Sequence, residues 1–326
     1  MAEQSFSDKL HITIYIITLL TGLPFNILAL YAFLCKARQK AGPNIIFLIN
    51  LTISDLAFLL FLPFKILESA KGSLWILPVF LCPFSGLFYF SAIYSSILFL
   101  TAVSVERYLG VAFPIRYNMY RKPVYGILIS FVLWVCAFSH CSIVYITEYQ
   151  RVGNYSSNET VCYDSFTESQ LTVLLPFRLE LGIVLFFLPF LITTFCYTSF
   201  VRILLSSTHI SREKKQRAIG LVLTTLFVFL VCFAPYNISH FVGFIQNKSP
   251  SWRTDALLLS TFNTSLDPII FYFSSTAVKR TCKGCFSNLT RELSSFKPVH
   301  LFITFLRKRN EALKAESFDQ TQCSKL

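Results

Sequence analysis

Charged residues are scarce in this chain of 326 residues: Asp, Glu, Lys and Arg together make up 14%, while 54% of the residues are hydrophobic and 16% aromatic. Soluble globular proteins carry about 25% charged residues. The composition therefore predicts a polytopic membrane protein rather than a soluble enzyme. Metalloprotease, nucleophile-elbow and phosphate-loop motifs are also missing, which argues against an enzyme of any kind. No internal repeat is visible, which disfavours a transporter built from duplicated halves.

Long apolar stretches are abundant, and seven of them could each cross a hydrocarbon core of about 30 Å as a helix. They predict an all-α membrane protein: a seven-transmembrane helix bundle followed by a short amphipathic eighth helix. The expected regions are an extracellular N-terminus (1–10), a membrane domain (11–280) and a cytoplasmic tail (281–326). The predicted spans are 11–35, 43–66, 82–107, 124–146, 176–203, 218–244 and 254–274.

The basic residues indicate how the chain is oriented. Lys and Arg number 29 against 17 acidic residues, and most of the basic ones fall on the cytoplasmic side if the N-terminus is outside. This positive-inside pattern predicts a multi-pass plasma-membrane protein. It also predicts attraction to anionic membrane lipid and no binding of nucleic acid.

Covalent modification is expected at both faces of the membrane. Cys82 and Cys162 are the only cysteines placed near the oxidising face, so a disulfide between them would pin the loop after the fourth span to the third span. Asn154 and Asn158 in that loop begin glycosylation motifs. Two cysteines of the basic tail could be palmitoylated or remain free thiols: Cys282 and Cys285.

Polar residues occur inside the spans, where lipid makes them costly. Asp55 lies in the middle of the second span, and Asp267 precedes a proline in the seventh. Ser96 and Asn263 could reach the same depth. Two close carboxylates cannot both ionise cheaply, so the set is either a hydrogen-bonded packing cluster or a switchable site for a proton or a sodium ion. No other cofactor and no other metal is expected.

A second polar group is predicted near the outer ends of the spans. It consists of Arg178, Arg253, Tyr236, His240 and His140. Guanidinium groups bind carboxylates through paired hydrogen bonds, so convergence of these side chains would make an anion site. Alternatively, the arginines extend to lipid headgroups or pair with acids of the loop.

Several motifs, in order along the seven spans, resemble the rhodopsin-like (class A) G-protein-coupled receptors over roughly residues 12–280. The motifs are Gly22–Asn26, Leu51–Asp55, Glu106-Arg107-Tyr108, Trp134, Pro189 with Tyr197, Pro235 and Asp267-Pro268. Further segments are similar to the free fatty acid receptors, in particular their short-chain branch. These segments are Phe61–Lys65, Ser104–Pro114, Leu175–Glu180, Pro235–His240 and Ser265–Pro268.

The resemblance implies a receptor that is activated by short-chain carboxylates such as acetate, propionate and butyrate. In that branch the counterparts of Arg178 and Arg253 hold the carboxylate, and those of His140, Tyr236 and His240 line the pocket. It also implies coupling to heterotrimeric G proteins, of the inhibitory class and also of the phospholipase-coupled class, and binding of arrestin. The implied coupling residues are Glu106, Arg107, Tyr108 and Tyr197.

Other functions stay open on the sequence. Arginines could equally hold a hydroxycarboxylate or a nucleotide, so a receptor for another small anion is the first alternative. A carboxylate transporter would also need buried arginines and is the second. The seventh span also departs from the general Asn-Pro pattern of the class, because Asp267 stands before Pro268.

Overall fold

The computed structural model describes residues 6–39, 41–72, 74–152, 162, 166–208 and 210–274. Several predictions fall outside this part of the chain: the two glycosylation sites Asn154 and Asn158, the two tail cysteines Cys282 and Cys285, the eighth helix and the cytoplasmic tail.

The described residues form helices and no strands, which confirms the all-α prediction. Two of the rods are composite, each with a π-helical turn between two α-helices. In chain order the elements are α1 (Phe6–Gln39), α2 (Pro43–Ala70), α3 (Leu81–Ala112), α4 (Pro114–Tyr120), α5 (Pro123–Val152), α6 (Glu168–Leu181), η1 (Gly182–Phe187), α7 (Leu188–Ser206), α8 (Arg212–Val228), η2 (Phe229–Phe233), α9 (Ala234–Gln246) and α10 (Arg253–Ser274).

In the part of the chain that the structure describes, the rods number seven when the short helix α4 is left out and each composite is counted once. Six of them are long and apolar enough to cross a membrane. The seventh is α10, whose 22 described residues extend over about 33 Å, comparable to a hydrocarbon core. The predicted seven-helix bundle is therefore confirmed.

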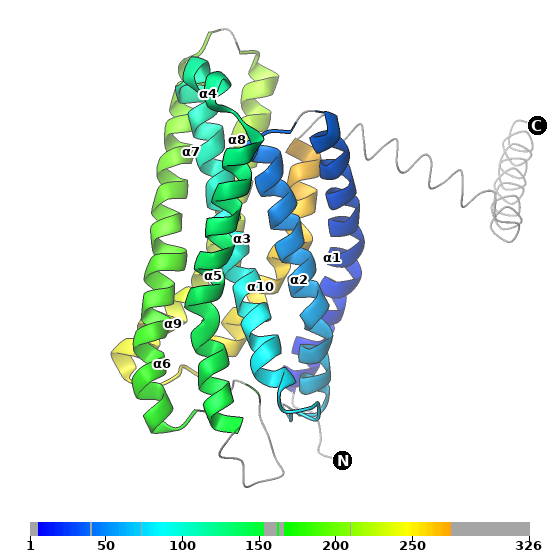
Figure 1. Cartoon of the computed structure of the whole chain (residues 1–326), viewed down its shortest axis with the longest axis vertical. Coiled ribbons are helices and arrows are strands. Elements are labelled where there is room, and N and C mark those ends of the chain that lie inside the picture. The colour runs from blue at the N-terminus through cyan, green and yellow to red at the C-terminus, as the bar shows by residue number, and fades with distance from the viewer. Residues whose placement is uncertain are drawn as a thin grey trace, which may run out of the picture. The chain divides into compact units, whose positions relative to one another are not determined.

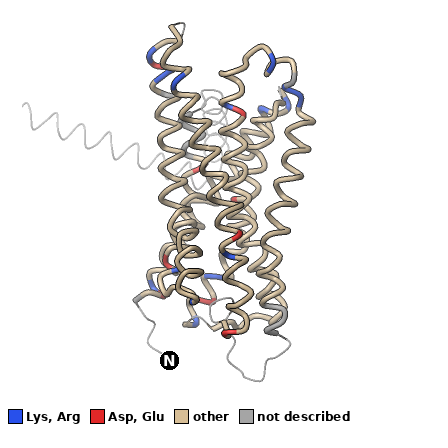
Figure 2. The backbone as a smooth tube through the Cα atoms, turned by 90° about the vertical axis from the view of Figure 1, so that its left-hand side faces the viewer, with Lys and Arg blue, Asp and Glu red and all other residues tan. Residues whose placement is uncertain are grey.

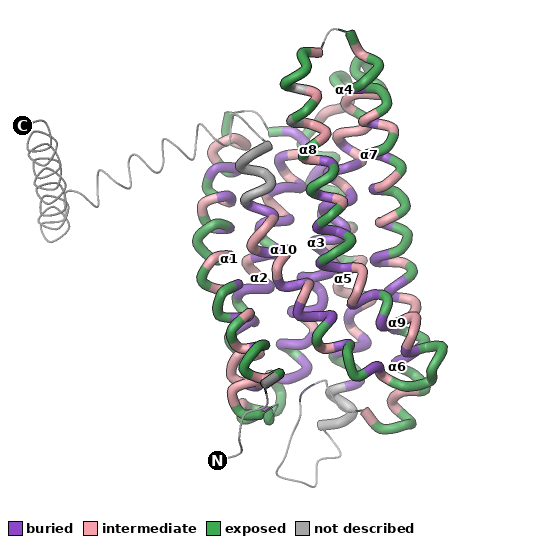
Figure 3. The backbone as a smooth tube through the Cα atoms, turned by 180° about the vertical axis from the view of Figure 1, so that it is seen from behind, coloured by how far each residue is buried: buried purple, intermediate pink, exposed green. Residues whose placement is uncertain are grey.

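Helix α3 lies at the centre of the bundle (Figure 1) and packs against α2, α5 and α7. Its most apolar window is 83% buried, whereas the corresponding window of α5 is 28% buried. Helix α1 packs against α2 and α10 and closes the ring of helices. Buried segments accordingly line the inside of the bundle and exposed segments its outside (Figure 3). Apolar residues on the outside are expected where lipid is the solvent.

Several helices extend beyond the predicted spans. Helix α1 begins at Phe6, and α3 continues to Ala112, past the Glu106-Arg107-Tyr108 triplet. Helix α6 begins at Glu168 because Thr167 and Gln170 form a capping box. In that box the Thr167 hydroxyl accepts from the Gln170 amide at 3.3 Å, and the Gln170 side chain accepts from the Thr167 amide at 3.0 Å. For α6, this polar cap starts the helix outside the apolar layer.

The two π-helical turns each precede a proline. Pro189 follows η1, and Pro235 follows η2. Proline has no amide hydrogen, and its ring clashes with the carbonyl four residues earlier, which lies in η1 in one case and in η2 in the other. A wider turn relieves the clash, so the predicted proline kinks take the form of π-turns.

The bundle has two chemically different ends. At one end the Cys82–Cys162 disulfide ties the first turn of α3 to the segment before α6, as predicted; we call it the disulfide end. At the other lie Glu106, the short helix α4 and the connection from α7 to α8 (Figure 1); we call it the Glu106 end. Charged residues gather at both ends and are sparse between them (Figure 2).

Candidate functional site

Arg178 and Arg253 both lie at the disulfide end and both are buried. Arg178 stands in the last turn of α6 and is 2% exposed; Arg253 begins α10 and is 4% exposed. The Arg178 Nη1 donates to Ser249 Oγ at 3.2 Å, and its guanidinium lies 4.9 Å from the centroid of the Phe166 ring. Both guanidinium groups are thus buried among the helices rather than extended away from them.

His240 and Tyr236 occupy one face of α9, four residues apart, with their ring centroids 4.6 Å from each other. Both side chains are buried. The hydroxyl of Tyr94 donates to Asn237 Oδ1 at 3.2 Å and lies 3.2 Å from His240 Nε2, so it can accept from that nitrogen. In the described part of the chain His240 Nδ1 has no hydrogen-bond partner. It is therefore a buried polar atom that could contact a ligand.

The charges of Arg178 and Arg253 both act on the His240 imidazole. Coulombic interaction weakens with distance and with exposure to water, so both guanidinium groups lie near the buried imidazole. The structure thus brings four of the five predicted anion-site residues to one region, contributed by α6, α9 and α10: Arg178, Arg253, Tyr236 and His240.

A polar cavity of about 240 Å³ opens beside Arg253, between α1, α2, α3 and α10. Phe90 forms part of its wall and stacks on Tyr236, with ring centroids 6.1 Å apart. Lys65 and Glu68 also line the cavity and form an ion pair at 2.8 Å. The cavity can hold several water-sized groups, and one of the two arginines faces it.

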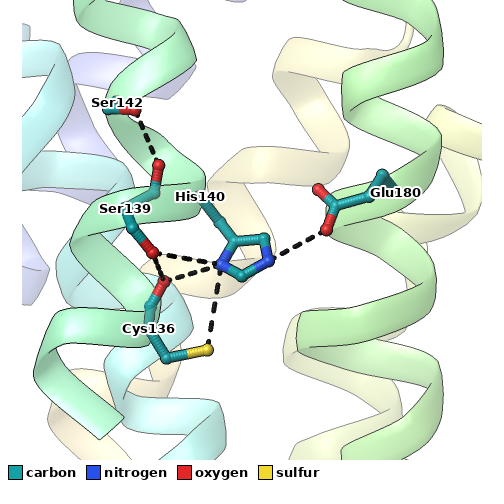
Figure 4. A network of polar contacts seen from close by, with 5 residues as sticks. All are labelled: Cys136, Ser139, His140, Ser142 and Glu180. Atoms are coloured by element: carbon teal, nitrogen blue, oxygen red, sulfur yellow. Dashed lines mark hydrogen bonds and ion pairs between the residues drawn. The ribbon is translucent and has the colours of Figure 1, made fainter. Parts of the chain in front are cut away.

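His140 has different neighbours. Its Nε2 lies 2.9 Å from Glu180 Oε1, and its Nδ1 lies 2.8 Å from the carbonyl oxygen of Cys136 (Figure 4). The hydroxyl of Ser139 lies 3.4 Å from the same Nδ1. The imidazole therefore links α5 to α6. A direct contact between His140 and a ligand stays a prediction.

The four predicted ion-site residues meet in the middle of the bundle. Ser96 donates to Asp55 Oδ1 at 3.3 Å, and Asn263 Nδ2 donates to Asp267 Oδ2 at 3.0 Å. The two carboxylates are close enough to interact electrostatically. A cavity of about 10 Å³ is lined by Asp55, Ser96 and Asn263, among others. In the described residues, Asp55 Oδ2 and Asn263 Oδ1 have no hydrogen-bond partner.

The predicted coupling residues separate into two contacts at the Glu106 end. The hydroxyl of Tyr117 on α4 donates to Glu106. Burial, followed by this hydrogen bond, raises the pKa of Tyr117, so the phenol stays protonated as a donor. Arg107 instead acts electrostatically on the buried Tyr197 of α7. Tyr108 contacts the ring of Phe195, at 5.8 Å between centroids.

The sequence did not single out several residues that complete these sites: Tyr94, Phe166, Ser249 and Tyr117. Tyr94 is a buried phenol in the central helix, where a hydroxyl needs a partner. That requirement was the one available signal for it. Phe166 and Ser249 lie in connecting segments, where no periodicity indicates which side chains turn inward.

A bundle of seven membrane-length helices, with a buried polar site at one end and the Glu106-Arg107-Tyr108 triplet at the other, defines a membrane receptor rather than an enzyme. Residues 25–271 match the family model of the 7 transmembrane receptor (rhodopsin family). The chain is 49% identical over 278 residues to free fatty acid receptor 2 of Rattus norvegicus, covering 84% of each protein. It is 48% identical over 268 residues to free fatty acid receptor 3 of Mus musculus, covering 82% of this chain and 83% of that receptor.

Free fatty acid receptor 1 of Macaca fascicularis is more distant, at 31% identity over 274 residues, which cover 80% of this chain and 90% of that receptor. The chain therefore belongs to the free fatty acid receptors of the rhodopsin family.

Proposed function

We propose that this chain is a receptor for short-chain carboxylates such as acetate, propionate and butyrate. The observation that carries the proposal is the burial of Arg178 and Arg253, whose charges converge on His240. Burying cationic groups is costly unless they meet an anion or other acceptors. The names of the relatives, free fatty acid receptors 2 and 3, supply a carboxylate as that anion.

In this proposal the two guanidinium groups hold the carboxylate through charge-assisted hydrogen bonds. Tyr236 and His240 orient it, and Phe90 contacts the alkyl tail. Propionate has five heavy atoms, so at about 1.5 kcal/mol per atom its binding energy cannot exceed about 7.5 kcal/mol. The dissociation constant is then no better than several micromolar. Such a receptor detects abundant metabolites.

The signal passes to heterotrimeric G proteins at the Glu106 end, through Glu106, Arg107, Tyr108 and Tyr197. The proposal includes the inhibitory and the phospholipase-coupled classes of G protein, and arrestin as a further partner. The protein lies in the plasma membrane with the disulfide end and the N-terminus outside, because disulfides form in oxidising compartments. The basic residues of the opposite face then lie against anionic lipid of the inner leaflet.

The test is propionate-stimulated G-protein dissociation in cells, with surface expression matched. Arg178→Ala and Arg253→Ala should each lower potency by about a hundredfold, because truncating one partner of a buried charge pair costs about 2–5 kcal/mol. Arg→Lys at either position should recover only part of the loss, since an ammonium cannot form the paired contact. Lys248→Ala, an exposed cation near the same end, is the matched control and should leave potency unchanged. Full propionate potency in either alanine variant would refute the clamp.

The alternatives are separated in the same cells. Lactate and nucleotides presented beside the C2 to C6 acids test the other small anions. Uptake of labelled acetate tests the transporter: flux above background without G-protein activation would favour it over the receptor.

We also propose that a sodium ion binds between Asp55 and Asp267. The residues fit such an ion: sodium takes oxygen ligands, two oxygens of the site lack hydrogen-bond partners among the described residues, and the cavity holds one water-sized body. Replacing sodium by choline in the medium should change propionate affinity several-fold in the unmodified receptor, and Asp55→Asn should abolish the change. An Asp55→Asn receptor that keeps the same sodium dependence would exclude this site.

A further inference from the structure

The two buried arginines share a local sequence pattern. Each is followed two positions later by an acid: Glu180 after Arg178, and Asp255 after Arg253. Two residues correspond to about 200° of helix rotation, so the acid and the arginine face opposite sides of their helix. Exposure agrees with this geometry. The arginines are 2% and 4% exposed, whereas the side chains of Glu180 and Asp255 are 40% and 63% exposed.

Each of these acids meets a histidine from a neighbouring helix. Glu180 Oε1 lies 2.9 Å from His140 Nε2 on α5 (Figure 4). Asp255 Oδ1 lies 3.3 Å from His11 Nε2 on α1. Segments 40 and 244 residues apart in the chain thus form the same kind of pair, each next to one of the arginines.

Both imidazole rings are fixed from their other side as well. His140 Nδ1 lies 2.8 Å from the Cys136 carbonyl oxygen, and His11 Nδ1 lies 2.8 Å from the Ser7 carbonyl oxygen. Carbonyl and carboxylate oxygens only accept hydrogen bonds, so in each histidine both ring nitrogens face acceptors. Each histidine therefore presents a ring of fixed orientation to its acid. The His140–Glu180 contact has the length of a hydrogen bond, whereas His11 Nε2 and Asp255 lie close together without forming one.

We propose that His140–Glu180 and His11–Asp255 are positioning pairs that set the rotation of α6 and α10 about their axes. Each pair holds the acidic face of its helix against α5 or α1. The opposite face, which carries the arginine, then points into the bundle toward His240. This inference rests on the proposed function. It assigns His140 a role through Glu180 and not through contact with the ligand.

The experiment is a double-mutant cycle on propionate potency at matched surface expression, with His140→Ala, Glu180→Ala and the double variant. Each single variant should lower potency about fivefold, as expected for a partly exposed pair. The double variant should be no weaker than the singles, because the same contact is lost in each. Glu180→Gln keeps an acceptor for Nε2 and should lie between wild type and Glu180→Ala. The control Glu168→Gln removes an exposed acid from the same helix and should leave potency unchanged.

The reciprocal exchange His140→Glu with Glu180→His gives a readout that a ligand contact would not give. It restores the pair in reverse and should recover potency to within about twofold of wild type, the accuracy with which distant effects add. Penalties that multiply in the double alanine variant, to about 25-fold, would overturn the pair. So would an exchange variant that reaches the surface and stays as weak as His140→Ala. These results would not contradict the proposed binding of the carboxylate by Arg178 and Arg253. That proposal is tested separately by the arginine variants.

The His11–Asp255 pair is tested by the same cycle with His11→Ala and Asp255→Ala. The expected loss is smaller, about two- to threefold, because the Asp255 carboxylate is 63% exposed and screened by water. The two losses should again fail to multiply in the double variant, and multiplication would refute this second pair.

Discussion

A glycine beside the arginine site offers a sharp test of the packing that brings Arg178 and His240 together. Gly182 is buried where α6 meets η1, one turn after Arg178. A Cβ atom built on Gly182 would lie 3.2 Å from Phe241 Cε2, 3.7 Å from the Asn237 carbonyl oxygen and 3.8 Å from His240 Cβ. The backbone of α9 approaches this closely because residue 182 has no side chain.

The expected size of the effect follows from those distances. In Gly182→Ala the new methyl group requires a shift of a few tenths of an ångström from Phe241, whose ring is only partly buried. A gain in helix propensity of about 1 kcal/mol offsets that shift, so stability and propionate potency should change little. Gly182→Val adds two more methyl groups in the same space and should cost about 1–3 kcal/mol. The strain moves α9 away from α6, and potency should fall about tenfold.

The assay is propionate potency together with thermal stability of the detergent-solubilised receptor. Gly220 in α8 supplies the matched control, since a Cβ there meets nothing within 4 Å. Gly220→Ala and Gly220→Val should leave potency unchanged. If Gly182→Val behaves like Gly220→Val, the close approach of α6 and α9 is not what holds the site together.

Two further predictions concern the ends of the bundle. Tyr117→Phe removes the hydrogen bond to Glu106, whose carboxylate then competes for Arg107. Maximal G-protein activation should fall about two- to threefold, on the scale of a single hydrogen bond, while propionate potency is retained. A shift in potency alone would contradict this prediction. Cys162→Ser opens the disulfide at the edge of the cavity beside Arg253 and should lower stability by about 2–5 kcal/mol, seen as a lower melting temperature; an unchanged melting temperature would show that the loop is held by other contacts.

The seven-helix fold could be predicted because lipid leaves so few alternatives. Every backbone polar group in the hydrocarbon core must be paired within its own segment, so apolar length translates directly into helices. The ends of the helices are harder to predict from the sequence, because several helices continue through polar residues beyond the apolar layer. One signal was readable and not used: Thr167 and Gln170 have the capping-box spacing that starts α6. The short helix α4 lacks any apolar run and was not predicted.

The candidate site was predicted residue by residue but not in its geometry. The inside and the outside of a membrane helix are both apolar, so periodicity cannot show that Arg178 points inward and Glu180 outward. For the same reason the partner of His140 was open, because the contact joins residues 40 positions apart on different helices. The arginines and His240 stood out by their cost in lipid, and Tyr236 by its spacing of four residues from His240 on one helix face. Tyr94 did not stand out, because no ionisable residue lies three or four positions from it in the sequence.

The two π-turns lie between the arginine site and the Glu106 end, in both composite rods. In the first rod, η1 lies between Arg178 and Tyr197. In the second rod, η2 lies between Val222 and His240. Val222 packs in the same buried cluster as Tyr197. A wide turn before a proline interrupts the α-helical hydrogen-bond pattern, so side-chain packing contributes to the bend of the rod there. If a ligand binds one bent conformation of the rods more tightly than another, it shifts the equilibrium toward that conformation by the difference in binding free energy. The segments α7 and α8 carry Tyr197 and Val222, and they lie beyond these bends. We therefore expect a carboxylate in the proposed site between α6, α9 and α10 to act on Arg107 through the packing around Tyr197, without touching either residue.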